Sequence, residues 1–239
     1  AIKERYGIDT VCHVLCNGFT REETEDFLID LNFGGINNVL AIKGDYKGYQ
    51  KPLPKDRTKN EHAIDLVQQI VNINRGIYLE NLVDAEPTDF CIGVAGYPEK
   101  HFSSPNLETD IRHLKEKVDA GAEYVVTQMF FNNEAYFSFV EKCKSVGINV
   151  PIIPGIKILT VKKHLISLPT DFHIDIPYAL SQKVADAGKD DVPKIGIDWA
   201  TQQTLELLAQ KVPVVHFYVM GNTKSTIAVM NNLNLAKKD

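Results

Sequence analysis

Residues 90–131 read FCIGVAGYPEKHFSSPNLETDIRHLKEKVDAGAEYVVTQMFF, and this stretch decides the fold. It contains an apolar run that ends in Ala95-Gly96-Tyr97-Pro98, a polar loop, a segment with helical periodicity and a second apolar run. Two short continuous apolar runs joined by a helix are typical of buried parallel strands, so the stretch predicts a β-α-β unit. Its polar residues follow the carboxyl ends of the strands, which is where parallel α/β proteins have their active sites.

The rest of the chain repeats this alternation of strand and helix, six times in all. Thr20 and Glu23 form a capping-box pattern before one of the expected helices. Residues 46–60 are polar, contain two prolines, and are predicted to form a loop that covers a ligand. The expected strands are residues 10–16, 36–42, 90–94, 124–131, 150–156 and 212–220. The expected helices are residues 20–33, 61–73, 110–118, 134–146, 160–168, 177–184, 197–210 and 223–233, with a charged connector at 186–194.

Regular alternation with right-handed crossovers predicts either an open doubly wound sheet or a closed barrel. Polar or glycine residues mark four of the strands, at His13, Gly44-Asp45, Tyr97 and Gln128, which favours one central opening. We therefore predict an α/β fold, a (β/α)8 TIM barrel, with residues 1–239 as a single catalytic barrel domain. Six units would leave two strand edges unpaired, so the first two βα units are expected upstream of Ala1.

Composition excludes several classes of function. The chain has 239 residues, 44% of them hydrophobic and 24% charged, and a net charge of −5, which is not the footprint of a nucleic-acid-binding protein. No apolar run approaches the roughly 20 residues that span a bilayer, and no signal peptide is recognisable, so we expect a cytoplasmic protein. The motifs GxGxxG and GxxxxGK[ST] are absent, and the seven histidines are scattered, so no metal site is expected. Four cysteines are expected to be reduced thiols: Cys12, Cys16, Cys91 and Cys143.

Three candidate residues at the strands admit both a structural and a functional interpretation. Asp45 follows a glycine and is either a turn cap or a carboxylate that biases a bound ring or a developing cation. His13 has apolar neighbours, which is the usual setting of a core histidine. Gln128 is a neutral amide in a buried strand and must find partners, which a heterocyclic amide edge would supply.

A second group surrounds the predicted helix after residue 106. Asp110 and Lys117 are seven residues apart with His113 between them, so they share one helical face. This is either a solvated face or a pair that reaches a ribose hydroxyl and a pyrophosphate. The ring of Tyr97 either packs in its loop or lies against a planar cofactor.

Five motifs give the chain a family resemblance: AIKGD (41–45), GVAGYPEKH (93–101), KVDAGAEYVVTQMFF (117–131), IIPGI (152–156) and HFYVM (216–220). In this order and at these spacings the chain resembles the methylenetetrahydrofolate reductase family over residues 2–233. The resemblance implies a (β/α)8 barrel that binds FAD. It also implies reduction of 5,10-methylenetetrahydrofolate to 5-methyltetrahydrofolate by NADH or NADPH, in a ping-pong cycle that belongs to one-carbon metabolism and methionine biosynthesis.

The resemblance also implies roles for individual residues. The FAD-contacting positions are His13, Lys43, Gly44, Asp45, His62, Ala63, Tyr97, His101, Asp110, His113 and Lys117. The substrate-binding positions are Gln128, His164 and Tyr218, and Asp45 is expected to act in catalysis. Departures from the family pattern are Lys43 for a common arginine, His62 for an aromatic residue, His164 for a glutamine and Asn222 for an arginine. The family's catalytic glutamate would precede Ala1.

Two alternatives remain open at this stage. A relative that binds flavin or folate without catalysis would share these motifs, and another barrel flavoenzyme, such as proline dehydrogenase, would share the architecture. The expected partners are small-molecule substrates and not nucleic acid or a membrane, and a homo-oligomer is expected.

Overall fold

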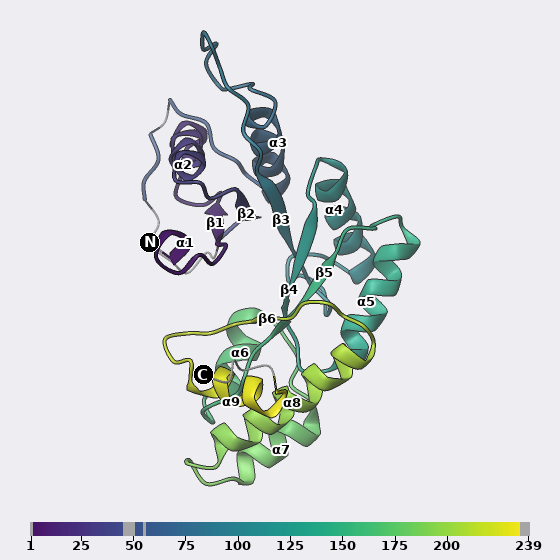
Figure 1. The fold of residues 1–239 in the computed structure, drawn as a ribbon. Helices are drawn as coiled ribbons and strands as arrows, with labels where there is room; N and C mark the ends of the chain where they lie inside the picture. The colour runs from purple at the N-terminus through teal and green to yellow at the C-terminus, as the bar shows by residue number, and fades with distance from the viewer. Residues whose placement is uncertain (1, 45–50, 55, 235–239) are drawn as a thin grey trace. The chain divides into compact units, whose positions relative to one another are not determined.

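The structure is a computed structural model that describes residues 2–44, 51–54 and 56–234. Within these ranges, strands and helices alternate along the chain (Figure 1). The strands are β1 (Val11–Leu15), β2 (Asn38–Ile42), β3 (Cys91–Gly96), β4 (Tyr124–Met129), β5 (Ile152–Ile156) and β6 (His216–Phe217). The helices are α1 (Ile2–Tyr6), α2 (Arg21–Phe33), α3 (Ala63–Ile73), α4 (Leu107–Asp119), α5 (Asn133–Ser145), α6 (His164–Phe172), α7 (Tyr178–Asp186), α8 (Val192–Ala209) and α9 (Lys224–Asn232).

The six strands form one sheet in the order β1-β2-β3-β4-β5-β6. The pairs β1–β2, β2–β3 and β5–β6 are parallel. Sequential order with helical connections confirms the predicted α/β class and is the order expected of a TIM-like barrel. The two additional units expected before Ala1 stay a prediction.

Contacts divide the chain into two compact units. The first unit comprises residues 1–95 and 112–125, and the second comprises residues 96–111 and 126–239. The predicted single catalytic barrel domain stays a prediction. No helix in the described ranges combines the length and the apolar character needed to cross a membrane.

In the first unit, α2 shows how local sequence sets a helix boundary. The Thr20 hydroxyl accepts a hydrogen bond from Glu23 N at 3.2 Å, and the Glu23 carboxylate accepts one from Thr20 N at 3.0 Å. This is the predicted capping box, and it satisfies two amides that a helix start leaves without partners. Leu28 is fully buried on the inner face of the helix.

A glycine permits a close crossing inside the same unit. A Cβ atom at Gly93 of β3 would lie 2.2 Å from the Tyr124 ring. The ring therefore lies against the strand, and the Tyr124 hydroxyl donates to Val39 O on β2 at 2.8 Å. Burial raises the pKa of this phenol, so the hydroxyl remains a donor at physiological pH.

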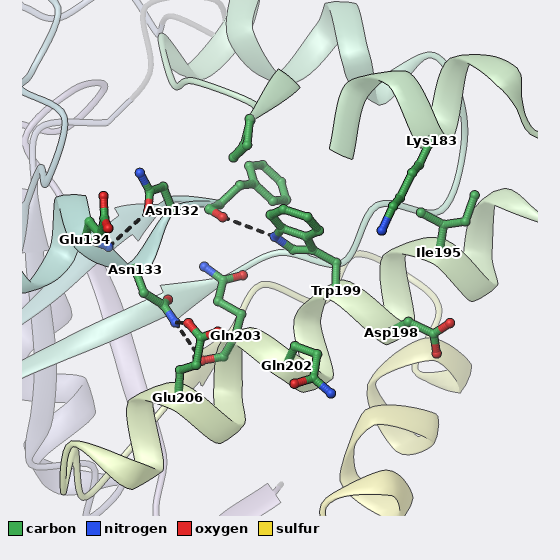
Figure 2. Close-up of a pocket in the computed structure, with 12 residues that line it drawn as sticks. Asn132, Asn133, Glu134, Lys183, Ile195, Asp198, Trp199, Gln202, Gln203 and Glu206 are labelled. Carbon is green, nitrogen blue, oxygen red and sulfur yellow. Dashed lines mark hydrogen bonds between the residues drawn. The ribbon is translucent and has the colours of Figure 1, made fainter. Parts of the chain in front are cut away.

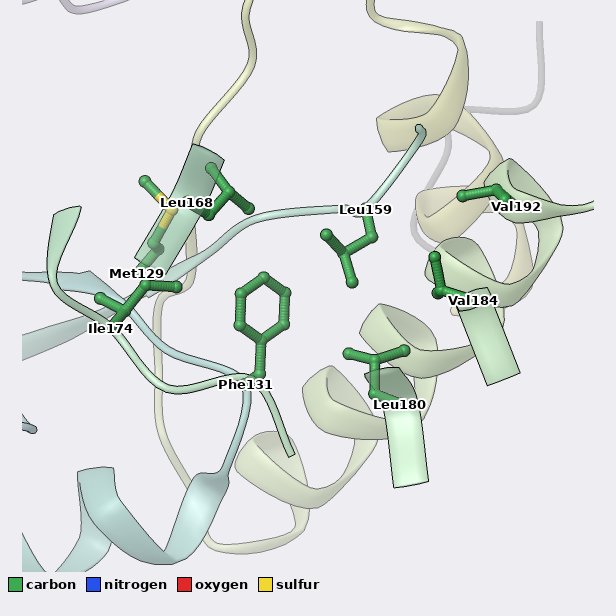
Figure 3. Close-up of a cluster of buried hydrophobic side chains, with 8 residues drawn as sticks. All are labelled: Met129, Phe131, Leu159, Leu168, Ile174, Leu180, Val184 and Val192. Carbon is green, nitrogen blue, oxygen red and sulfur yellow. The ribbon is translucent and has the colours of Figure 1, made fainter. Parts of the chain in front are cut away.

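In the second unit, the adjacent phenylalanines 130 and 131 are both buried, and they enter two different cores. Phe131 lies among Leu159, Leu168 and Leu180 in the cluster of Figure 3. Phe130 packs in a separate cluster with residues of α5, α8 and α9. Helix α8 contacts both α7 and α9 (Figure 1).

Three predicted elements in this unit have wrong boundaries. Helix α6 is His164–Phe172, where residues 160–168 were expected, because residues 161–163 form a bend and a turn before it. Helix α8 begins at Val192 and not at residue 197, because Pro193 suits the first helical turn and the charged residues before it do not prevent helix formation. Strand β6 contains only His216–Phe217, where residues 212–220 were expected. Pro213 has no N–H to donate to a strand ladder, and the pairs in register between β5 and β6 are Gly155–His216 and Ile156–Phe217.

Candidate functional site

In the first unit, the predicted FAD-contacting residues lie on β1, after the carboxyl end of β2, at the start of α3 and on α4. His13 lies on β1 in register with Leu40 and is exposed, so its interpretation as a core histidine is wrong. Lys43 and Gly44 follow β2, where Asn17 N donates to Lys43 O at 3.0 Å and Asn17 Nδ2 donates to Gly44 O at 2.9 Å. Gly44 has a φ of 88°, a conformation that favours glycine.

Lys117 lies at the same edge although it comes from a helix. Its Nζ donates to Ala95 O of β3 at 2.8 Å, so the side chain extends from α4 to the carboxyl end of the strand. His113, one turn earlier on α4, is exposed. The interpretation of these residues as a merely solvated face therefore does not describe Lys117, which is half-buried.

His62 and Ala63 mark the start of α3. The Asp65 carboxylate accepts hydrogen bonds from Glu61 N at 3.1 Å and from His62 N at 2.9 Å, so Asp65 caps this helix. The imidazole of His62 takes no part in the capping and is exposed. An exposed flat ring at this position can stack on a planar ligand, as the resemblance implies.

In the second unit, Asp110 holds the loop that follows β3. One oxygen of its carboxylate accepts from His101 N at 3.0 Å, and the other accepts from the Ser104 hydroxyl at 2.9 Å. The rings of Tyr97 and His101 meet edge to face with their centroids 4.6 Å apart. Asp110 therefore orders the loop that carries two predicted cofactor contacts, and its own contact with a ribose stays a prediction.

Glu99, in the same loop, was missed by the sequence analysis. Its carboxylate accepts a hydrogen bond from Asp175 N at 2.8 Å. Burial, together with the charge of Asp175, raises the pKa of Glu99 from an ordinary value of 4.5 to about 7. Only its place beside Tyr97-Pro98 could have suggested it, because a carboxylate in a polar loop is usually solvated.

The raised pKa of Glu99 predicts how the free energy of unfolding depends on pH. Between pH 4.5 and about 7 the folded state binds more protons than the unfolded state, so this carboxyl lowers stability as pH rises through that window. We expect Glu99→Gln to remove this fall and to be more stable than the unmodified protein at pH 8, by about 1 kcal/mol because the group is partly exposed. Urea denaturation at pH 5 and pH 8 measures the difference. The exposed Glu141→Gln is the control, and equal pH slopes for all three proteins would contradict the prediction.

Gln128 and Tyr218, two predicted substrate contacts, lie at the ends of β4 and β6. Gln128 Oε1 accepts from Met129 N at 2.9 Å, and Gln128 Nε2 has no protein acceptor among the described residues. The Tyr218 hydroxyl donates to Thr127 O at 2.8 Å. Burial raises the pKa of Tyr218 to about 12. A Cβ atom at Gly155 would lie 2.6 Å from the Tyr218 ring, so glycine is what allows this ring to cross β5.

Lys157 was also missed, although it follows the IIPGI motif directly. It is only 8% exposed, and its Nζ donates to Tyr218 O at 3.1 Å. Burial lowers the pKa of Lys157. His164, the third predicted substrate contact, is nearby: its pKa is lowered by burial and by the charge of Lys157, and its Nδ1 accepts from Thr160 N at 3.3 Å.

A separate cavity of about 720 Å³ lies between the start of α5 and helices α7 and α8, and none of the predicted site residues lines it. Figure 2 shows Trp199, Gln203 and Glu206 of α8 beside Asn133 of α5. Trp199 Nε1 donates to Phe131 O at 3.1 Å, and Asn133 Nδ2 donates to Glu206 at 2.8 Å. These bonds join α8 to Phe131, which follows β4, and to the start of α5.

Asp45, the predicted catalytic residue, lies outside the described residues. Within the described ranges, no group of three or more His, Cys, Asp or Glu side chains could hold a metal ion. The four cysteines are free thiols in the structure.

Comparison with known proteins identifies the family. The model of the family described as methylenetetrahydrofolate reductase matches residues 1–234. The chain belongs to this family. "Methylenetetrahydrofolate reductase (NADH) 1" of Arabidopsis thaliana is 31% identical over 95% of the chain and 38% of its own length. The 5,10-methylenetetrahydrofolate reductase of Salmonella typhimurium is 31% identical over 98% of the chain and 73% of its own length.

The chain spans less than two fifths of the length of several eukaryotic relatives, among them the Arabidopsis and fission-yeast reductases at 38% and 37%. A solved structure has a similar fold: a Clostridium thermocellum protein that binds two copies of 5-methyl-5,6,7,8-tetrahydrofolic acid. It matches with a TM-score of 0.60 and 18% identity, over 97% of this chain and 75% of its own. At this identity the likeness supports the fold alone.

Proposed function

We propose that the protein is a flavin-dependent methylenetetrahydrofolate reductase, which reduces 5,10-methylenetetrahydrofolate to 5-methyltetrahydrofolate with NADH or NADPH. The observation that carries the proposal is the family match over residues 1–234. Relatives named for NADH and for NADPH both match the chain, so the family alone does not choose the electron donor.

The residues assigned to FAD suit that group chemically. Lys43 and Lys117 provide ammonium groups that match the charge of a pyrophosphate. The backbone at Gly44 has a φ of 88° and carries no Cβ, which permits a close approach of a ligand to the main chain. Tyr97 and His62 provide flat rings, of which the His62 ring is exposed at the start of α3. These residues would hold FAD, and the chemistry that the group would supply there is hydride transfer between the nicotinamide and the folate.

The remaining residues would bind the folate and stabilise the charge that forms on it. Because Gln128 Oε1 is already held by Met129 N, its Nε2 group is the part that can donate to an acceptor on the pterin. The Tyr218 ring, fixed by its bond to Thr127 O, offers a rigid surface for the aromatic part of the folate. Asp45 would provide a negative charge that stabilises the cation formed when the folate ring opens. In this proposal Gln128 and Tyr218 orient the substrate, and the carboxylate of Asp45 stabilises the positive charge that forms on it.

Spectroscopy and turnover of the purified protein test the proposal. We expect FAD, bound on purification or after addition, to give absorption in the blue that is lost on anaerobic addition of NADH or NADPH. Addition of 5,10-methylenetetrahydrofolate should then restore the absorption and yield 5-methyltetrahydrofolate. Proline, tested in the same way, is the control substrate. A protein that refuses FAD, or that binds it and forms no 5-methyltetrahydrofolate, contradicts the proposal.

A further inference from the structure

The cavity between the start of α5 and helices α7 and α8 belongs to the second unit, and its volume is about 720 Å³. None of the residues assigned to FAD or to the folate lines it. Three carboxylates and one ammonium group line it, a formal charge of −2, and they belong to Glu134, Asp198, Glu206 and Lys183. No ion pair between described residues involves any of these four side chains. This excess of negative charge favours a cationic ligand.

Two buried amide side chains in the cavity wall have oxygen atoms without partners. Asn133 is 7% exposed and Gln203 is 4% exposed. Asn133 Nδ2 donates to Gln203 O at 3.0 Å and to Glu206 Oε2 at 2.8 Å, and Gln203 Nε2 donates to the main chain at the end of β4. Asn133 Oδ1 and Gln203 Oε1 accept no hydrogen bond from any described residue. Buried amide oxygens normally have a donor, so these two indicate a ligand that brings N–H groups.

Helix α8 brings an aromatic ring and a carboxylate to the same place. Trp199, Gln203 and Glu206 are four and three residues apart, so they share one face of the helix. Figure 2 shows the Gln203 amide between Asn133 and Trp199, with its oxygen on the side of Trp199. The indole is held in place because its Nε1 donates to Phe131 O at 3.1 Å. Glu206 Oε1 accepts no hydrogen bond from a described residue, so it can accept one from a ligand. The face of an indole ring attracts cations, and a carboxylate beside it adds to that attraction.

We propose that this cavity binds a small organic cation, whose guanidinium or ammonium group donates to Asn133 Oδ1, Gln203 Oε1 and Glu206. Both groups carry several N–H donors and no acceptor, which matches a wall of oxygen atoms without donors. The volume of the cavity is in the range that holds a small molecule. The apolar part of the ligand would lie against the indole of Trp199. Binding of such a cation does not require the reductase activity, because the residues assigned to that activity lie elsewhere.

Titration of the holoenzyme with amino acids tests the site. The probes are L-arginine for the guanidinium group and L-lysine for the ammonium group. L-Citrulline is the control ligand, because it has nearly the shape of arginine and an uncharged side chain. The fluorescence of Trp199, the single tryptophan of the chain, reports on the cavity directly, and calorimetry measures the same binding independently. We expect at least one of the two cations to bind with saturation, and L-citrulline to bind about tenfold more weakly or not at all.

Two glutamate variants show whether binding occurs in this cavity. Glu206→Gln removes the negative charge and keeps an oxygen atom that can accept from Asn133 Nδ2, so the local hydrogen bonds are retained. We expect this variant to bind the cation about tenfold more weakly, because a bond between charged groups is lost. Glu141→Gln changes an exposed carboxylate of α5 outside the cavity and should bind as the unmodified protein does. Circular dichroism of each variant establishes that it is folded before titration.

The outcomes separate the cation site from the proposed function. Saturation by only one of the two cations supports the site and identifies the group that it prefers. If neither cation binds, if L-citrulline binds as tightly as they do, or if Glu206→Gln and Glu141→Gln bind equally well, the inference is overturned whether or not the protein reduces folate. If a cation binds through Glu206 and no 5-methyltetrahydrofolate is formed, the reductase proposal fails and the cation site stands.

Discussion

Gly196→Ala is expected to destabilise the second unit by about 3 kcal/mol or more, because the site has no room for a methyl group. A Cβ atom at Gly196 would lie 1.9 Å from Leu159 O and 2.8 Å from Leu159 C. These are backbone atoms of the segment that follows β5, so neither can move aside as the end of a flexible side chain can. Helix α8 would have to shift away from that segment, and the buried contacts of Leu159 in the cluster of Figure 3 would be disturbed.

The measurement uses the single tryptophan of the chain. Trp199 lies on α8, one turn after Gly196, so its fluorescence during urea denaturation reports on this region. Gly188→Ala is the matched control, since its Cβ would meet only the carboxylate of Asp191, an exposed side chain that can rotate. We expect the control to change the free energy of unfolding by less than about 0.5 kcal/mol. Equal stabilities of the two variants would show that α8 can move at little cost.

Sequence reasoning succeeded where local chemistry determines structure. The capping box of Thr20 and Glu23 needs only two side chains and the amides beside them, and it forms as predicted. The apolar run that contains Phe130 and Phe131 predicted two buried rings, and both are buried. Such features depend on residues that are close in sequence, so a periodic pattern is sufficient to find them.

Features that depend on distant segments were not found in the sequence. The burial of Lys157 results from the return of Tyr218 beside β5, and the raised pKa of Glu99 results mainly from burial of its carboxylate, to which the charge of Asp175 adds. For the candidate site, sequence patterns located the strand ends, whereas the family resemblance supplied the individual roles. His13 is exposed on β1 and Lys117 reaches the end of β3, and the roles of both residues stay predictions.

Asp45→Asn is the second change with a large expected effect, and it acts on chemistry. The family resemblance assigns Asp45 to the position beside the reacting rings, where its carboxylate would stabilise a cationic form of the folate. Loss of the charge should slow reduction of 5,10-methylenetetrahydrofolate about 100-fold, the usual cost of removing one preorganised electrostatic contact. Oxidation of NADH or NADPH should change much less, since hydride leaves the nicotinamide before the folate cation forms.

Stopped-flow measurement of the two half-reactions, each with one substrate alone, distinguishes this role from a structural one. Asp56→Asn is a suitable control, because it removes an exposed carboxylate from the same polar segment, residues 46–60. A general loss of flavin binding or of folding would slow both half-reactions to the same degree, and that result would exclude a specific action of Asp45 on the folate. Selective slowing of folate reduction, absent from Asp56→Asn, requires a charge effect on the transition state of that step, because the substitution changes the charge and hardly the shape of the side chain.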